Sequence, residues 1–421
     1  MSTAAATDVP DKKTPKKQSR LFANAQRLGR SLLLPIAVMP AAGILLRLGQ
    51  SDMLGAIPGF EQGASIVAAA GNGVFTWLPL LFAVGIAIGW AKKSDGTTAL
   101  AAVVGYMVMY EVWKAMSPIV LAGVEDANGE QATINFGVLG GIVMGLVAAV
   151  LWQRFHRTKM PDFLGFFSGR RLVPILTAVA GLVIAVLMSF VYRYFDIALT
   201  AAGQAVADNA VIGGGVFGFV NRMLIPIGLH QLLNFFPWFQ LGSFTADGVT
   251  YHGDIARFLA GDPTAGIFQT GFFPIMMFAL PAGALAIWRN AKPQNRKVVG
   301  GIMISAALTS FVTGITEPLE YSFMFVAFPL YVIHAVLTGT SLALVNALGI
   351  RDGFSFSAGA IDYVLNFGKA DGAIWLIPIG LAYAVVYYFL FSFVIKKWNL
   401  RTPGREDDTI AENTIDAATK P

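Results

Sequence analysis

Residues 314–320 read GITEPLE, and they place two carboxylates between the apolar runs Val298–Val312 and Tyr321–Ile333. A carboxylate at the depth of a bilayer costs roughly 3 kcal/mol, so it needs a polar partner, a water-filled cavity or a ligand. Gly314 and Pro318 also predict a break in the helix, and such a break is tolerated in a membrane only where protein buries it or it lines a cavity. The segment therefore indicates the binding site of a transporter. The alternative is an interfacial loop between two helices.

The composition is typical of a membrane protein. Hydrophobic residues make up 55% of the chain and charged residues only 13%, about half the usual share. The net charge of +5 lies mostly in loops and tails, which fits the positive-inside rule and not nucleic-acid binding. We predict an all-α integral membrane protein, because about ten apolar runs approach the length that crosses a bilayer. These runs are Leu32–Leu48, Val74–Ala91, Thr97–Val112, Phe136–Trp152, Leu172–Val191, Val211–Phe239, Gly266–Trp288, Val298–Val312, Phe323–Leu348 and Ile374–Ile395.

Several kinds of chemistry are missing from the sequence. The chain has no cysteine, which excludes disulfides, cysteine metal ligands and a cysteine nucleophile within it. Its four histidines, His156, His230, His252 and His334, are too scattered to suggest a metal cluster. There is no phosphate loop of the GxxxxGK[ST] kind. We therefore expect no cofactor, no metal and no nucleotide-driven transport.

Lysine and arginine clusters predict the orientation in the membrane. Residues 1–20 are basic and polar, so we expect a disordered cytoplasmic tail followed by an uncleaved first span; a long signal-peptide n-region is the alternative. Clusters at 92–93 and 154–171 agree with a cytoplasmic N-terminus, whereas alternation would place the cluster at 289–297 outside. The clustered charges are the stronger signal, so the chain must deviate from simple alternation.

Two irregular elements resolve that conflict. One is expected between about Phe236 and Thr270 and the other between Thr313 and Asn366, each as a re-entrant hairpin or a pair of half-helices. The second contains the GITEPLE segment. With both elements, the C-terminus is also cytoplasmic.

The intramembrane polar residues divide the chain into two parts. Residues 21–196 are expected to form an N-terminal scaffold half, 197–209 an interfacial linker, and 210–397 a C-terminal transport half that holds nearly all of the polar residues. Residues 398–421 form a second cytoplasmic tail. One continuous helical bundle is the alternative.

Arg222 and His230 form a second candidate cluster. They are eight residues apart, slightly more than two helical turns, so a helix bent at Pro226 presents both to one cavity. Alternatively, Arg222 snorkels to an interface and His230 is a satisfied core histidine.

In the GITEPLE segment, a carboxylate can accept hydrogen bonds from two vicinal sugar hydroxyls. We assign that role to Glu317 and expect Glu320 to be a structural partner of Arg222.

Two further clusters have weaker patterns. Residues 353–363 combine small residues with aromatic faces, which suits either a ligand-lining loop or a tight turn. Residues 261–266, with Asp254 and Arg257 upstream, favour a hydrophilic turn. Phe235, Phe236, Trp238 and Phe239 suggest an aromatic belt at the membrane surface, although one or two of them could stack on a sugar.

The sequence resembles the membrane component, EIIC, of the glucose superfamily of the bacterial phosphoenolpyruvate-dependent sugar phosphotransferase system, from about Arg27 to Arg405. The most specific match is GITEPLE; the others are GLH at 228–230, KPQNR at 292–296 and FSFSAGAIDY at 354–363. Within the family, three segments are more similar to the N-acetylglucosamine branch than to the glucose branch. They are LLN at 232–234, WFQLG at 238–242 and GFFPIMMF at 271–278.

The resemblance implies ten transmembrane helices plus two re-entrant hairpins, a homodimer made through the N-terminal half, and an elevator-like C-terminal half. It also implies that Glu317, His230 and Arg222 hold the sugar. We therefore assign a catalytic role to Glu317 and His230. The expected substrate-binding residues are Glu317, His230, Arg222, Asn234, Thr316, Phe356 and Ser357.

The same resemblance implies the partners and the location. In many family members a fused EIIB domain with a phosphorylated cysteine follows a segment like Thr402–Glu406, but this sequence has no cysteine. We therefore expect a separate phospho-EIIB, charged by an EIIA-type donor, to phosphorylate imported N-acetylglucosamine on carbon six in the bacterial plasma membrane. The alternatives are a glucose or glucoside EIIC, an ion-coupled secondary transporter, and a non-transporting receptor.

Overall fold

The computed structural model describes residues 24, 27–28, 31–32, 35, 37–125, 129–246 and 248–405, and they are predominantly helical. The expected disordered tail at residues 1–20 and most of the C-terminal tail lie outside the described residues. In the first part of the chain the helices are α2 (Met39–Leu48), α3 (Glu61–Thr76), α4 (Leu78–Trp90), α5 (Gly96–Val120), α6 (Gly137–Phe155) and α7 (Leu172–Ala207).

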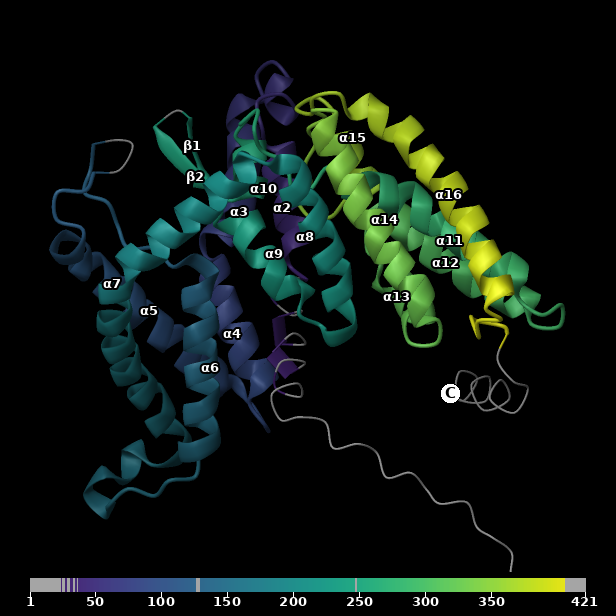
Figure 1. Cartoon of the computed structure of the whole chain (residues 1–421). Coiled ribbons are helices and arrows are strands. Elements are labelled where there is room, and N and C mark those ends of the chain that lie inside the picture. The colour runs from purple at the N-terminus through teal and green to yellow at the C-terminus, as the bar shows by residue number, and fades with distance from the viewer. Residues whose placement is uncertain are drawn as a thin grey trace, which may run out of the picture.

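The second part adds nine α-helices to the described chain and one antiparallel hairpin (Figure 1), in which Ser243 pairs with His252. The hairpin consists of β1 (Ser243–Ala246) and β2 (Val249–His252). The helices are α8 (Ala210–Leu224), α9 (His230–Phe239), α10 (Asp254–Leu259), α11 (Leu280–Asn290), α12 (Arg296–Thr313), α13 (Glu317–Met324), α14 (Phe328–Ala347), α15 (Ala360–Asn366) and α16 (Leu376–Lys397).

The described residues contain six helices that are long and apolar enough to cross a membrane, or seven if α3 and α4, bent by 49°, count as one span. The prediction of a helical membrane protein is thus confirmed, and about ten spans remains an expectation. Several predicted runs are interrupted: Val211–Phe239 is divided between α8 and α9, and Phe323–Leu348 breaks before α14. Hydropathy reports only that a run is apolar, so it does not locate such breaks.

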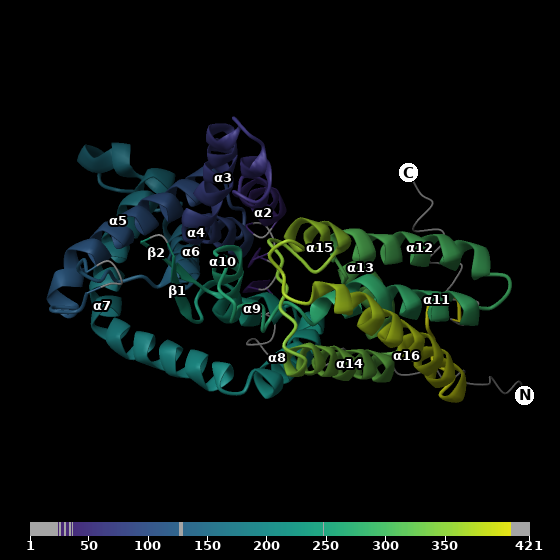
Figure 2. The same cartoon turned by 90° about the horizontal axis from the view of Figure 1, so that it is seen from above.

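The helices gather into two bodies (Figure 2). In the first, α5 packs against α7 and α4 against α6. In the second, α8 packs against α14, while α11 packs against α12 and α16. A separate apolar cluster, which includes Leu78, Phe82 and Phe235, joins α4 and α6 to α9. The two bodies therefore have their own cores and meet along the flank of α9.

Residues 197–207, expected to belong to an interfacial linker, continue α7 without a break. They contain no proline or glycine pair that would end the helix, and α8 begins at Ala210 after only two non-helical residues. The division into a scaffold half and a transport half remains an expectation.

Both segments expected to be irregular do contain irregular backbone. The first holds the β-hairpin and the non-helical turns that follow α10, and the second holds the breaks around the short helices α13 and α15. The charge pattern did not predict a hairpin of strands in the first segment, and the re-entrant character of both segments remains an expectation.

Helices α2 and α3 pack with almost no space between their backbones. A Cβ atom on Gly71 of α3 would lie 2.4 Å from the Leu46 amide nitrogen and 2.6 Å from the Ala42 carbonyl oxygen, both in α2. Since backbone atoms cannot rotate away, only glycine permits this contact. The contact also fixes α2, which carries Met39 toward the second body.

We expect Gly71→Ala to lower the apparent melting temperature of the purified protein, because overpacking costs about 1–3 kcal/mol. Gly73→Ala is the matched control: it lies in the same helix and a Cβ there meets no atom within 4 Å. Thermal unfolding followed by fluorescence size-exclusion chromatography measures both. Equal melting temperatures for the two variants would contradict the close α2–α3 contact.

Candidate functional site

The candidate site begins at a complete break between α8 and α9. Helix α8 ends at Leu224, a 3₁₀ turn that contains Pro226 follows, and Gly228 has φ of +71° before α9 begins at His230. The positive φ favours glycine and ends the turn. The expected bend is therefore a break, and Arg222 and His230 come from two different helices.

A second break precedes α13. Gly314 ends α12 with φ of +73°, and α13 begins at Glu317 with Pro318 in its first turn. A proline suits that place because the first amides of a helix have no intrahelical acceptor. The Ser357 hydroxyl donates to the Gly314 carbonyl at 2.9 Å. This bond attaches the loop before α15 to the break.

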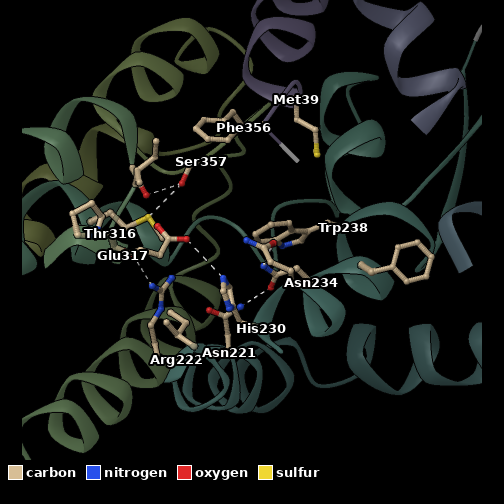
Figure 3. A pocket seen from close by; sticks show the side chains of 18 of the residues that line it. Met39, Asn221, Arg222, His230, Asn234, Trp238, Thr316, Glu317, Phe356 and Ser357 are labelled. Atoms are coloured by element: carbon tan, nitrogen blue, oxygen red, sulfur yellow. Dashed lines mark hydrogen bonds and ion pairs between the residues drawn. The ribbon is translucent and has the colours of Figure 1, made fainter. Parts of the chain in front are cut away.

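A cavity of about 420 Å³ lies between the two bodies (Figure 3). This volume is within the range of small-molecule sites. All seven residues assigned to substrate binding from the sequence line the cavity, and Ala37, Met39 and Phe82 of the first body line its other side. The remaining lining residues are Asn221, Ile225, Gln231, Phe235, Trp238, Phe239, Met276, Gly314, Ile315, Pro318 and Tyr321.

Glu317 and His230 face each other in this cavity (Figure 3). The His230 Nε2 atom is 3.8 Å from Glu317 Oε1. Among the described residues, the buried Nδ1 atom of His230 has no hydrogen-bond partner, and the Glu317 side chain is 30% exposed. The pair therefore offers a carboxylate and an imidazole with unused hydrogen-bonding capacity, as a polar ligand requires.

Arg222 is held by the second carboxylate of the GITEPLE segment. Its Nη1 atom donates to Glu320 Oε1 at 2.7 Å and to the Thr316 hydroxyl at 3.1 Å. The side chains of Arg222 and Glu320 are 4% and 0% exposed. The predicted pairing of Glu320 with Arg222 is present, so the guanidinium reaches the cavity with its charge already compensated.

Amide side chains form another polar wall. Asn221 Nδ2 donates to Asn234 Oδ1 at 2.5 Å, and Asn234 Nδ2 lies 3.4 Å from Gln231 Oε1. The assignment from the sequence included Asn234 but neither Asn221 nor Gln231. These two are only sequence neighbours of Arg222 and His230, and adjacent residues do not share a helix face, so no pattern pointed to them.

Aromatic residues complete the wall and revise the interpretation of the belt. Phe235 is 3% exposed, and Phe235, Trp238 and Phe239 all line the cavity. Phe82, Phe356 and Tyr321 add faces from other parts of the chain. Such faces suit the apolar side of a sugar ring.

The cluster near residues 254–266 does not line this cavity. The buried Asp254 carboxylate accepts hydrogen bonds from the amides of Gly266 and Phe268, and Arg257 pairs with Asp262 at 2.7 Å. The cluster therefore stabilises a turn, as its sequence pattern favoured. Within the described part of the chain, no three His, Asp or Glu side chains converge as metal ligands.

Apolar helices long enough to span a bilayer, with a cavity between two bodies that is lined by apolar and a few charged side chains, are typical of a membrane transport protein. Residues 29–339 match the family model for the EIIC component of the phosphotransferase system. The chain belongs to this family.

Two relatives and one solved structure show which members of this family the chain is similar to. The chain is 54% identical to a Streptomyces coelicolor N-acetylglucosamine-specific EIIC component, over 99% of this chain and all of that one. It is 49% identical to a Bacillus subtilis N-acetylglucosamine-specific EIICB component, over 92% of this chain and 80% of that one. Its fold is similar to that of the transporter ChbC, the IIC component of a diacetylchitobiose-specific phosphotransferase system, with a TM-score of 0.61. The similarity covers 90% of this chain and 94% of the ChbC chain, at 13% sequence identity.

We expect Glu320→Gln to destabilise the folded protein by about 3–5 kcal/mol, because it leaves the buried Arg222 charge without a counter-ion. Glu317→Gln is the matched control, since the Glu317 carboxylate faces the cavity and is partly exposed. Chemical denaturation of both variants in the same detergent measures the difference. If Glu320→Gln unfolds at the wild-type midpoint, the ion pair does not hold α8 to α13.

Proposed function

We propose that this protein imports N-acetylglucosamine and presents it to a phospho-EIIB for phosphorylation at the 6-hydroxyl. The observation that carries the proposal is the pair Glu317 and His230, which meets in a cavity between two bodies with free hydrogen-bonding capacity. The similarity to N-acetylglucosamine-specific relatives supports the choice of sugar.

The cavity chemistry suits a neutral amino-sugar derivative. Glu317 is available to accept hydrogen bonds from two vicinal hydroxyls, and His230 can donate or accept. The amides of Asn221, Asn234 and Gln231 can both donate and accept, as an acetamido group requires. Because Arg222 is paired with Glu320, no uncompensated cation on α8 favours an anionic ligand in place of a sugar.

The proposed phosphoryl transfer breaks the sulfur–phosphorus bond of the EIIB phosphocysteine and forms a bond between phosphorus and the sugar O6. The O6 proton passes to the Glu317–His230 pair, and the thiolate leaves on EIIB. Such transfers depend mainly on positioning and charge stabilisation. These 421 residues contain no cysteine, so the phosphocysteine must come from residues outside this sequence. The basic segments 154–171 and 289–297 are suited to attract that partner.

The proposal includes an elevator movement of the second body against a scaffold that dimerises. Residues on both bodies line the cavity, so a displacement of one body against the other opens the cavity to one side of the membrane or the other. The cytoplasmic position of both termini belongs to the same proposal, and the basic clusters support it.

We expect vesicles containing the protein to accumulate labelled N-acetylglucosamine 6-phosphate only when phospho-EIIB is supplied. Glu317→Gln should lower this uptake by at least about 100-fold, because it removes the carboxylate that orients the hydroxyl. Glu111→Gln is the matched control, since Glu111 is an exposed carboxylate on α5 that does not line the cavity and is paired with Lys114.

Each other outcome identifies an alternative. Uptake of glucose in place of N-acetylglucosamine would keep the family and overturn the choice of sugar. Accumulation of unmodified sugar without phospho-EIIB would indicate an ion-coupled transporter, and binding without flux would indicate a receptor. Wild-type uptake by Glu317→Gln would remove this residue from the mechanism.

The absence of cysteine makes the elevator testable with pairs of spin labels. We expect labels at Ile119 of α5 and Ile374 beside α16, both well exposed, to change their distance distribution when sugar and phospho-EIIB are added. The control pair, Ile119 and Tyr194 of α7, lies within the first body and should not change. Unchanged distances in both pairs during turnover would contradict the elevator movement.

A further inference from the structure

Glu320 contacts a second buried group on the side away from the cavity. The His334 Nε2 atom on α14 lies 3.2 Å from Glu320 Oε1, and its Nδ1 atom lies 2.9 Å from the Tyr387 hydroxyl on α16. The side chains of Glu320, His334 and Tyr387 are all completely buried. A line of polar groups therefore runs from the cavity wall through Arg222 into the core of the second body.

The bonding capacity of each group fixes the direction of these hydrogen bonds. Glu320, as the ion-pair partner of Arg222, is a carboxylate that can only accept, so His334 Nε2 carries a hydrogen and donates it. His334 Nδ1 is then an acceptor that faces the Tyr387 hydroxyl, which also lies 3.3 Å from the His334 carbonyl oxygen. Glu320 thus fixes the tautomer of His334, Tyr387 holds the ring from its other side, and His334 holds the carboxylate that holds Arg222.

Arg222 needs this support because few other contacts orient it. Its backbone carbonyl accepts from the Tyr331 hydroxyl, and its guanidinium lies over the Phe272 ring at 4.8 Å. Its buried Nε atom has no partner among the described residues. Glu320 and Thr316 are therefore the side chains that fix the polar end of Arg222, and Thr316 contributes a neutral hydroxyl at 3.1 Å.

We propose that His334 and Tyr387 are positioning residues of the sugar site, which act on sugar affinity through Glu320 and Arg222. This inference rests on the proposed function together with the expectation from the sequence that Arg222, which lines the cavity, helps to hold the sugar. His334 does not line the cavity, and Glu320 and Arg222 separate it from the cavity wall, so it touches no reacting atom. Its effect is to keep one planar guanidinium in one orientation at the cavity wall.

The test measures the Kd of N-acetylglucosamine by isothermal titration calorimetry on the full chain in nanodiscs. We expect His334→Leu, which removes both hydrogen bonds, to raise the Kd about tenfold, as coupled neighbours in one network do. Tyr387→Phe removes only the hydroxyl that faces His334 Nδ1, so it should raise the Kd by less than His334→Leu does. His334→Gln should restore affinity to within about twofold, because its amide nitrogen can still donate to Glu320.

Two controls separate positioning from damage to the fold. Ser341→Ala removes another fully buried hydrogen bond of α14, from the Ser341 hydroxyl to the Gly271 carbonyl at 2.7 Å, and should leave the Kd unchanged. In an Arg222→Lys background, His334→Leu should have no further effect on the Kd. The flexible ammonium of lysine has no planar group whose orientation the network could fix.

The outcomes distinguish this inference from the proposed site. Weakened binding in Glu317→Gln with unaltered binding in His334→Leu and Tyr387→Phe would overturn the inference alone. An equal effect of His334→Leu in the wild-type and Arg222→Lys backgrounds would also overturn it, since His334 would then act by another route. Undiminished binding in Glu317→Gln would instead overturn the proposed sugar site. If His334→Leu does not fold, Tyr387→Phe and His334→Gln decide the question in the same assay.

Discussion

The buried ion pair between Arg222 and Glu320 is the constraint on which the site depends. It joins the end of α8 to α13, a helix of only eight residues that is too short to be stable by itself. Two charges without water are costly unless hydrogen bonds surround them, and Thr316 and His334 each supply one such bond. Because Glu317 lies one turn before Glu320, the same pair sets the position of the carboxylate that faces the cavity.

The site uses one local device twice. Gly228 and Gly314 both have positive φ, and each ends a helix shortly before another begins with a functional side chain, His230 in one case and Glu317 in the other. A continuous helix would direct successive polar residues around its whole surface. A break allows the first turn of the next helix to aim one side chain at a cavity while its backbone stays covered by protein.

The sequence predicted which polar residues line one cavity better than it predicted the bounds of the helices. A charged residue at bilayer depth has few permissible surroundings, so Glu317, His230 and Arg222 were informative individually, and all three line one cavity. Apolar residues are interchangeable by comparison. Whether a run such as Val211–Phe239 crosses a membrane once or breaks depends on tertiary contacts, so hydropathy did not divide it into α8 and α9. Asn221 and Gln231 were missed because an amide near a charge has no pattern of its own.

The charge balance of the cavity bears on the direction of transport. Glu320 compensates the charge of Arg222. The Glu317–His230 pair is therefore the group that offers a sugar unused hydrogen-bonding capacity. A neutral sugar meets no repulsion there, whereas a phosphate monoester carries about −1.5 to −2 charges at neutral pH. Placed beside the Glu317 carboxylate in a cavity lined largely by apolar side chains, that charge is destabilised. On the proposed function, the cavity that admits the substrate therefore expels the phosphorylated product, and the chemistry itself prevents the sugar from binding again on the cytoplasmic side.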